Sequence, residues 1–304
     1  MGFITEEMKQ ELLQLCRQIH FDEPMSRHTS IRVGGKADAL LYPSSLEEVT
    51  SLLAYLRQKK LPHFSLGAGS NLIVRDKGIR GVVLCMTQGF SGLRLEEPTI
   101  LYVESGVGLP RLIEFAVEKG LSGVEALVGI PGNVGGALVM NAGTPDGDIG
   151  RSVLSVTFVG PDGKIMTWGG EKIRFAYRES HFPRGVILLS TRLKLVSSTP
   201  ETVREKTEKL RAKRIETQPL NVPNLGSVFK NPQKAYAARL IEESGLKDVR
   251  VGGARISPKH ANFIVNEGRA TARDVLALVG LIKDKVKEKS GVSLELEAQV
   301  VGEE

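Results

Sequence analysis

"LVGIPGNVGGALVMNAG", residues 127–143, is the stretch that decides the fold. It holds five glycines and no large charged side chain. Glycines at this density usually let a main chain approach another group closely, because no Cβ stands in the way. The stretch therefore predicts a loop whose main chain lies close to another group, either a ligand or another part of the protein.

A second glycine-rich turn, "LGAGSN" (66–71), raises the same question, and neither stretch is a standard phosphate loop. The P-loop pattern is absent, because the Gly-Lys pairs at 35–36 and 163–164 are followed by Ala and Ile. In the 66–71 turn, Gly67 and Gly69 begin a GxGxxG pattern, but Leu72 stands at its third glycine and a strand-like "LIV" follows. Both loops could still expose consecutive N–H groups as an anion nest, to which Ser70 and Asn71 add side-chain donors. On glycine content alone, tight packing turns remain the alternative.

Size and charge allow several classes of protein. The 304 residues suggest two or three domains, and 41% hydrophobic with 25% charged residues is ordinary for a globular chain. The net charge of +6 suits an anionic small molecule or a nucleic acid. Part of the basic excess lies in "REKTEKLRAKR" (204–214), which is more simply a solvated helix face.

Neither the cysteines nor the histidines predict a metal site. Cys16 and Cys85 form no CxxC or zinc spacing, and the five histidines show no ligand spacing. The start of the chain has no signal-peptide pattern, and no apolar run approaches the roughly 18 residues of a membrane span. These features predict a cytoplasmic protein without a metal and without a membrane segment.

Hydrophobic spacing predicts a mixture of helices and strands. Helices are expected within 43–61, 109–120, 199–214 and 271–291. Ser45 with Glu48 suggests a capping box, and Thr199 with Pro200 another helix start. Strands are expected within 81–86, 99–106, 153–160, 164–168, 186–196, 261–266 and 292–302, with a hairpin turn at Asp162-Gly163. Without strict βαβ alternation, the pattern favours an α+β fold.

Seven motifs along the chain resemble one family. They are "TSIRVGGKAD" (29–38), "LGAGSNLIVRD" (66–76), "GIPGNVGGALVMNAG" (129–143), "YRES" (177–180), "NLGSVFKNP" (224–232), "LIEESGLKDVRVGGARISPKHANFIVN" (240–266) and "LELEAQVVG" (294–302). In this order they resemble the UDP-N-acetylenolpyruvoylglucosamine reductases, flavoenzymes that complete UDP-N-acetylmuramate in bacterial peptidoglycan synthesis. The resemblance runs from about residue 26 to the C-terminus.

The resemblance implies an FAD-binding fold of the vanillyl-alcohol-oxidase (PCMH) type, with two α+β subdomains followed by a C-terminal α+β substrate-binding domain. The implied subdomains are 1–85, to which a strand from 292–304 returns, and 86–215; the implied substrate-binding domain is 216–291. The 66–71 turn and the opening stretch would hold the FAD pyrophosphate, so no Rossmann helix is needed. The implied cofactor-binding residues are Leu66, Gly67, Ala68, Gly69, Ser70, Asn71, Gly129, Ile130, Pro131, Gly132, Asn133, Gly135, Gly136, Asn141, Ala142 and Gly143.

The family's reaction implies three catalytic residues. NADPH would reduce FAD, and hydride transfer to the enolpyruvyl double bond would follow. Ser227 matches the family's proton donor, Arg178 its active-site arginine and Glu297 its glutamate. Without the motifs, a turn serine and a surface arginine would be the simpler interpretations. Glu295 shares the alternation phase of Glu297, but the family places its glutamate five residues before the closing glycine, here Gly302.

The UDP-sugar substrate is expected to contact Tyr177, Lys230 and Asn231. Arg211 and Arg214 are alternatives for its phosphates, and His260 is a weaker candidate for the pocket. Only "ESHFPRG" (179–185) separates Arg178 from the next strand, which resembles the family's second subtype, without the tyrosine-loop insertion. A monomer or weak oligomer is expected.

Two other functions are alternatives on the sequence alone. Another FAD-dependent oxidoreductase on the same scaffold would share the glycine loops but has no need for "GSVFKNP". A non-enzymatic nucleotide or RNA binder would use the +6 charge. Against that binder, aromatic residues are only 5% of the chain and no RNP-like motif is present, so no nucleic-acid partner is expected.

Overall fold

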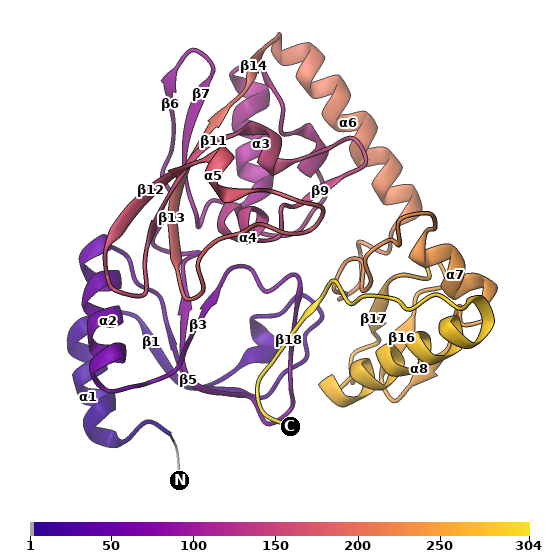
Figure 1. Ribbon diagram of the computed structural model, residues 1–304, viewed down its shortest axis with the longest axis horizontal. Helices are drawn as coiled ribbons and strands as arrows, with labels where there is room; N and C mark the ends of the chain where they lie inside the picture. Colours follow the sequence, from indigo (N-terminus) through magenta and orange to yellow (C-terminus); the bar gives the residue numbers. More distant parts are fainter. Residues whose placement is uncertain (1–2) are drawn as a thin grey trace. The chain divides into compact units, whose positions relative to one another are not determined.

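The computed structural model describes residues 3–304 and divides the chain into two compact units (Figure 1). The first unit contains the chain up to Phe21, Asp38–Ala68 and Gly81–Lys213; the second contains Asp22–Ala37, Gly69–Arg80 and Arg214–Glu304. Both units are therefore built from segments that are far apart in the sequence. One of the crossings between them falls inside the 66–71 turn.

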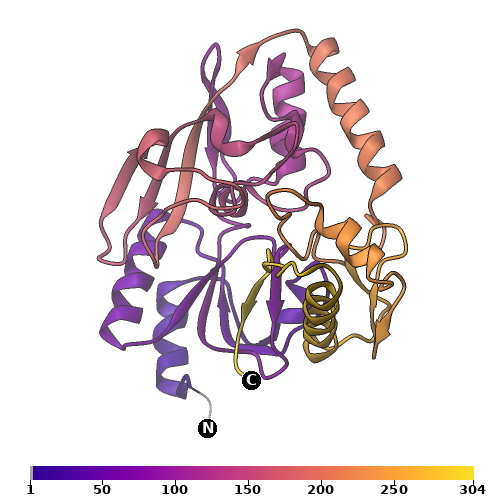
Figure 2. The ribbon, with the colours of Figure 1, turned by 45° about the vertical axis from the view of Figure 1, so that its right-hand side comes forward.

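The N-terminal part of the first unit is a small sheet covered by two helices. Its strand order is β1-β2-β5-β3, and Figures 1 and 2 both show α1 and α2 side by side. The bounds are α1 Glu6–Leu15, β1 Ile19–Pro24, β2 Lys36–Leu41, α2 Leu46–Gln58, β3 His63–Leu66 and β5 Ile79–Cys85. The apolar face predicted for α2 is buried in one core with β2 and β5. The N-terminus of α2 is capped by Ser45 as predicted, but the carboxylate of Glu48 accepts from the main-chain N–H of Ser44 instead of completing the box at Ser45.

The rest of the first unit is built on a five-stranded antiparallel sheet. Its order is β12-β11-β13-β7-β6, and the turn at Asp162-Gly163 joins β11 to β12 as predicted, with Val159 opposite Ile165. The bounds are β6 Leu93–Glu97, β7 Ile100–Glu104, β11 Val153–Val159, β12 Ile165–Gly169 and β13 Ile187–Lys194. Helices α3 (Leu109–Glu118), α4 (Val134–Val139) and α5 (Gly170–Ile173) bury residues in the same core as this sheet. Short elements complete this part: β8 Leu121–Ser122, η2 Glu125–Leu127, β9 Gly143–Thr144, β10 Gly147–Asp148, η3 Ile149–Ser152 and β14 Val196–Ser197.

The second unit packs helix α8 on a three-stranded sheet. The sheet order is β15-β16-β17, and the last strand, β18, pairs in parallel with β4. The bounds are η1 Met25–Arg27, β4 Leu72–Val74, α7 Ala237–Glu243, β15 Arg250–Val251, β16 Ala254–Ile256, β17 Ile264–Asn266, α8 Ala272–Ser290 and β18 Gln299–Val301. Helix α8 starts at a capping box of Thr271 and Asp274 and ends at Gly291, whose φ of 72° is typical of a helix C-terminus. Mixed helices and strands with this topology confirm the predicted α+β class.

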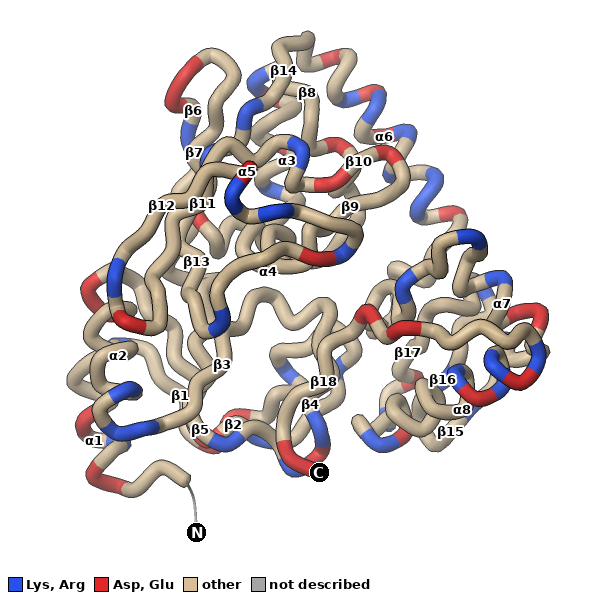
Figure 3. The backbone as a smooth tube through the Cα atoms, in the orientation of Figure 1, with Lys and Arg blue, Asp and Glu red and all other residues tan. Residues whose placement is uncertain are grey.

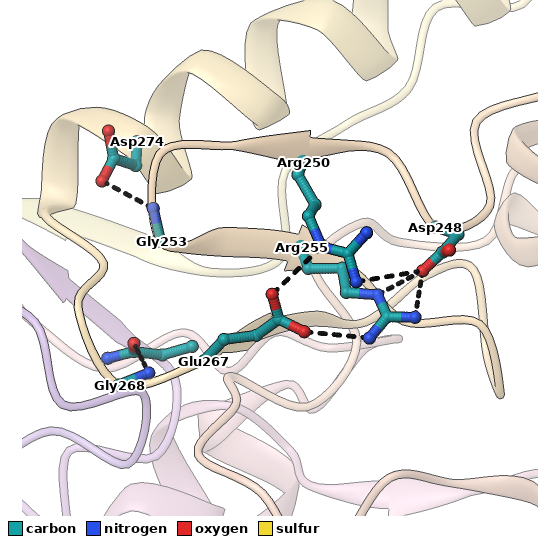
Figure 4. Close-up of polar contacts among 8 residues, drawn as sticks. Asp248, Arg250, Gly253, Arg255, Glu267, Gly268 and Asp274 are labelled. Carbon is teal, nitrogen blue, oxygen red and sulfur yellow. Dashed lines mark hydrogen bonds and ion pairs between the residues drawn. The ribbon is translucent and has the colours of Figure 1, made fainter.

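A charged cluster closes the hairpin of β15 and β16 (Figure 4). The guanidinium of Arg255 contacts the carboxylate of Asp248 and lies 2.9 Å from Glu267, which also contacts Arg250 at 3.1 Å. Two positive and two negative groups balance each other and are partly exposed, so each pair contributes little to stability. At the other end of the hairpin, Asp274 accepts from the main-chain N–H of Gly253 at 3.3 Å, which ties the helix cap to the sheet.

The predicted strand at 292–302 is wrong in its extent. Regular pairing covers only Gln299–Val301, while residues 292–298 are joined to the 228–230 segment through a single bridge, Phe229 with Leu296. The main-chain bonds at this bridge, from the N–H of Lys230 to the oxygen of Glu295 and from the N–H of Glu297 to the oxygen of Val228, keep 295–297 in an extended pairing. Glu295 is exposed and Glu297 is half-buried.

Helix α6 (Pro200–Thr217) is solvated along most of its length. Figure 3 shows Lys and Arg recurring along it among acidic residues, and only Val203 and Thr207 are buried. This confirms the interpretation of 204–214 as a solvated face. Among residues 3–304, no helix is long and apolar enough to cross a membrane.

One buried carboxylate in the first unit connects η2 to α6. Glu125 is 1% exposed, and its carboxylate accepts from the hydroxyl of Ser122 at 2.5 Å and the N–H of Gly123 at 2.7 Å. The ammonium of Lys206 on α6 lies 3.1 Å away. Burial raises the pKa of Glu125, but these hydrogen bonds outweigh burial, so its pKa is below the ordinary value.

Replacing this carboxylate should make stability less dependent on pH. Because folding lowers the pKa of Glu125, its contribution is present above the unfolded pKa of about 4.3 and is lost as the pH falls through the folded pKa. Glu125→Gln should reduce the free energy of unfolding by about 1–3 kcal/mol at pH 7, and the difference from wild type should shrink below pH 4. Urea unfolding over this pH range measures it, with Glu118→Gln, an exposed position on α3, as the control. An equal loss at every pH would contradict the role of the ionised carboxylate.

Candidate functional site

The 66–71 turn connects strand β3 to strand β4, so the chain continues as a strand and not as a helix. Gly69 has φ = 63°, and a Cβ at this position would lie 1.9 Å from the main-chain oxygen of His28. Only glycine satisfies both the left-handed conformation and this close approach. The alternative that the glycines serve tight packing is therefore partly correct: at Gly69 the turn packs against residues 28–29.

The second half of the turn has its carbonyl groups bonded within the protein. The oxygen of Gly69 accepts from the N–H of Ser30 at 3.1 Å, that of Ser70 from the Ser30 hydroxyl at 3.3 Å, and that of Asn71 from the N–H of Gln299 at 3.0 Å. Within the described part of the chain, no acceptor is found for the main-chain N–H groups of residues 69, 70 and 71. Three successive N–H groups without protein acceptors are what a phosphate-binding nest requires, so this turn fits an anionic cofactor.

The 127–143 stretch forms a loop and then the short helix α4. Gly135 lies against the end of β7: its N–H donates to the oxygen of Ser105 at 2.8 Å, and a Cβ at Gly135 would lie 3.1 Å from the Cβ of Ser105. Among residues 3–304, the N–H groups of Gly132 and Gly136 have no acceptor. This loop therefore combines close packing with free main-chain donors.

Asn133 joins the loop to the first half of the 66–71 turn. Its side chain is buried, with Oδ1 accepting from the N–H of Ala68 at 3.1 Å and Nδ2 donating to the oxygen of Ser105 at 2.5 Å. The amide of Asn141 is likewise engaged, with the oxygen of Ala176 at 2.8 Å and the N–H of Gly150 at 3.0 Å. The side chains of both asparagines are thus occupied in shaping the loop. That Asn133 and Asn141 contact the cofactor stays a prediction, and such contacts would come from their main-chain groups.

Ser105 is a residue that the sequence analysis missed. It is 2% exposed, and its hydroxyl has no hydrogen-bond partner in the described residues. A buried hydroxyl without a partner is unusual in a native protein and points to a missing ligand atom or water. The signal in the sequence was weak, because "ESG" at a strand end resembles many turns.

The second unit brings Ser227 and Glu297 together. Ser227 is half-buried and precedes the buried pair Val228 and Phe229; no bond to its hydroxyl is found within residues 3–304. The N–H of Glu297 donates to the oxygen of Val228 at 2.8 Å. The oxygen of Glu297 accepts from the side chain of Asn71 at 3.0 Å, so the 69–71 nest lies directly beside the glutamate's main chain.

The two polar residues after Ser227 have partners within the same unit. The ammonium of Lys230 lies 2.6 Å from the carboxylate of Glu295, which is 70% exposed. The Oδ1 of Asn231 accepts from the N–H of Ala237 at the start of α7 at 3.0 Å. Glu295 is therefore the counter-ion of Lys230, a role that the spacing of the two glutamates does not indicate.

Arg178 belongs to the first unit and sits at the tip of a two-residue turn. Hydrogen bonds of 2.9 and 3.2 Å join Ala176 and Glu179 across the turn, and Arg178 has φ = 57°. Its guanidinium lies 5.1 Å from the ring of Tyr177, which is 53% exposed. A non-glycine residue in the left-handed region is strained by about 1–2 kcal/mol. Arg174 in the same loop has φ = 53°, so this conformation does not by itself assign a role to Arg178, and its place in the active site stays a prediction.

No metal site accompanies these residues. Among residues 3–304, no group of three His, Cys, Asp or Glu side chains is placed to hold a metal ion. His260 packs against the ring of Phe263 with centroids 4.7 Å apart, and burial lowers its pKa. His260 is thus packed within this unit, and a contact of its ring with the substrate stays a prediction.

Comparisons with known proteins identify both parts of the chain. Residues 37–169 match the model of an FAD binding domain, and residues 218–301 match the C-terminal domain of UDP-N-acetylenolpyruvoylglucosamine reductase. The reductase of this name from Moorella thermoacetica is 45% identical over 286 residues, covering 94% of each chain. That from Syntrophomonas wolfei is 41% identical, covering 94% of this chain and 96% of the relative.

Solved structures agree with this assignment. The UDP-N-acetylenolpyruvylglucosamine reductase from Thermus caldophilus superimposes with a TM-score of 0.81 at 38% identity, covering 94% of this chain and 98% of that chain. The glucose dehydrogenase Phl p 4.0202, at 16% identity and a TM-score of 0.52 over 64% of this chain and 45% of its own, shares the fold alone. These likenesses confirm the predicted FAD-binding fold. The chain belongs to the UDP-N-acetylenolpyruvoylglucosamine reductase family of flavin-dependent oxidoreductases.

Proposed function

We propose that NADPH supplies the hydride with which this chain reduces UDP-N-acetylenolpyruvoylglucosamine to UDP-N-acetylmuramate, a step of peptidoglycan synthesis. Family membership over 94% of the chain supports the substrate and the reaction. The observation that carries the proposal is the Ser227 segment, whose half-buried hydroxyl has no partner among residues 3–304 and which is bonded to the main chain of Glu297. Another FAD-dependent oxidoreductase would need the glycine turns but not this serine.

FAD, when bound, supplies the hydride transfer between NADPH and the substrate. In our proposal the main-chain N–H groups of 69–71, together with those of Gly132 and Gly136, hold its anionic part, and the remaining residues of 66–71, 129–136 and 141–143 line the same cofactor. The support is the free N–H groups and the unpartnered hydroxyl of Ser105. Glycines there keep Cβ atoms away from the bound group.

Ser227 is proposed as the proton donor. Addition of hydride to the terminal carbon of the enolpyruvyl group leaves an electron pair on the carbon next to the carboxylate. The Oγ–H of Ser227 gives its proton to that carbon, forming the new C–H bond, and the serine regains a proton from solvent. A hydroxyl that is not already bonded to protein is available for this transfer.

Arg178 and Glu297 are proposed to handle charge. The planar guanidinium of Arg178 matches a carboxylate and would stabilise the negative charge that spreads into it. The main chain of Glu297 is fixed at both its N–H and its oxygen. Its carboxylate would orient the part of the substrate that receives the proton. We propose that the UDP-sugar is bound by Tyr177, Lys230 and Asn231. The ammonium of Lys230 would leave its ion pair with Glu295 and pair with a phosphate of the substrate. A reaction of NADPH with a UDP-sugar fits the cytoplasm, and we propose a monomer or weak oligomer as the working form.

The direct test is NADPH oxidation by the FAD-loaded protein. Adding the enolpyruvyl UDP-sugar should accelerate oxidation far above the rate with UDP-N-acetylglucosamine, because only the enolpyruvyl group accepts hydride. Absorbance at the NADPH band measures the rate. No acceleration by the enolpyruvyl substrate, in a protein that binds FAD, would favour the alternative oxidoreductase.

Ser227→Ala should separate the two half-reactions. Reduction of the flavin by NADPH should be nearly unchanged, whereas reoxidation by substrate should slow by about 10²–10⁴-fold, the usual value of general acid catalysis. Ser227→Cys should retain more activity, because a thiol still delivers a proton. Stopped-flow absorbance follows both steps. Equal damage to both would show that the serine only shapes the pocket.

Arg178→Gly should lower the activity while removing the strain in the main chain at this position. The free energy of unfolding should stay unchanged or rise by up to about 1 kcal/mol, because glycine accepts the left-handed conformation, while substrate-dependent reoxidation should fall by about 10²–10³-fold. Arg174→Gly is the matched control, since Arg174 has φ = 53° in the same loop; it should relieve the same strain and keep activity. Comparable activity in both variants would remove Arg178 from the site.

A further inference from the structure

The segment after Ser227 is held along one edge by a single side chain, that of Asn262. Its Oδ1 accepts from the N–H of Phe229 at 3.0 Å, and its Nδ2 donates to the oxygen of Phe229 at 2.8 Å. The main-chain oxygen of Asn262 also accepts from the N–H of Val228 at 2.9 Å. Asn262 is 3% exposed, so water does not compete for these bonds.

The other edge of the same segment is held by the segment that carries Glu297. The oxygen of Val228 accepts from the N–H of Glu297 at 2.8 Å, and the N–H of Lys230 donates to the oxygen of Glu295 at 2.9 Å. Residues 228–230 therefore lie between Asn262 and 295–297, although no regular strand covers either neighbour at this point.

The side chain of an asparagine can make the two hydrogen bonds that a neighbouring strand would otherwise make, because its amide carries one donor group and one acceptor in the geometry of a peptide. Both main-chain groups of Phe229 are buried and must be paired. Aspartate would place an oxygen against the oxygen of Phe229, and alanine would leave both groups unpaired. The sequence places Asn262 in "KHANFIVN", the motif for which the proposed chemistry had no use.

We propose that Asn262 is a positioning residue for the proton donor: its clamp on Val228 and Phe229 fixes the main chain from which Ser227 projects. The inference rests on the proposed function, because it assigns Asn262 an effect on the step that uses Ser227. It needs no contact of Asn262 with substrate or cofactor. A displacement of about 1 Å at a reacting group can cost about 10²-fold in rate, so a loosened clamp has a measurable consequence.

The first test is kinetic. Asn262→Asp and Asn262→Ala, each loaded with FAD, should reduce the flavin with NADPH as wild type does, and should reoxidise with the enolpyruvyl substrate about 10–10²-fold more slowly. Thr271→Ala is the control for lost stability, since it removes the cap of α8 in the same unit without touching the clamp. If the alanine variant does not fold, the near-isosteric aspartate variant carries the test.

The second test asks whether Asn262 acts through the serine. In a double-mutant cycle, adding Asn262→Asp to Ser227→Ala should slow reoxidation little further, because the donor that the clamp positions is already gone. Fully additive effects would overturn the inference. A Ser227→Ala protein with wild-type reoxidation would instead show that the proposed donor is wrong, and the inference would fall with it.

The third test requires no activity. Amide hydrogen exchange of the cofactor-free protein should be faster at Val228 and Phe229 in Asn262→Asp, with α8 unchanged, and the reverse should hold in Thr271→Ala. Parallel changes over the whole second unit, together with equal slowing of both half-reactions, would show that Asn262 only stabilises the fold and would overturn the proposal.

Discussion

The hydrogen bonds between buried asparagine amides and the main chain are the interaction on which the loops of this protein depend. Asn262 pairs both groups of Phe229, Asn133 joins Ala68 to Ser105, and Asn266 donates to the oxygen of Ile31 at 2.9 Å. Each of these loops is buried yet irregular, so its N–H and C=O groups cannot all be paired by strands or helices. An amide side chain supplies the missing partner at a fixed distance from its own backbone. The irregular segments can then be as ordered as the sheets that flank them.

The same constraint explains how the glycine turns could serve a cofactor without a Rossmann helix. In residues 69–71 the carbonyl groups are bonded inside the protein, and the N–H groups find no acceptor in the part of the chain that the structure describes. A helix N-terminus offers anions the same donors, with a dipole behind them. A strand–turn–strand connection provides donors only where the chain takes a left-handed residue, and Gly69 supplies it while lying against His28. Close packing and ligand binding are therefore two uses of one glycine.

Strain and order are distributed unequally over the chain. Three clusters of fully buried aliphatic side chains support the sheets and helices of the two units. The candidate catalytic residues lie outside regular elements: Arg178 on a strained turn, Ser227 after a left-handed glycine and Glu297 before the last strand. The neighbours of Ser227 in the chain, Val228 and Phe229, belong to the buried core of the second unit, so this segment is anchored by packing as well as by hydrogen bonds. A loop geometry that is unfavourable locally is thus maintained by hydrogen bonds to distant residues.

The sequence by itself determined the elements whose formation is local. The apolar faces of α2 and α8, the caps at Ser45 and Thr199, and the Asp162-Gly163 hairpin follow from spacing within a few residues, and the family motifs identified Ser227, Arg178 and Glu297 as candidates. Only the tertiary structure decided the partners. Asn262 is 35 positions from Ser227 and Glu297 is 70, with no periodic pattern joining them. The strand expected at 292–302 shortened to Gln299–Val301 because its remaining residues pair with the 228–230 segment instead of a strand. Long-range hydrogen bonds leave no local signature, since an asparagine that pairs a distant main chain reads like any other asparagine.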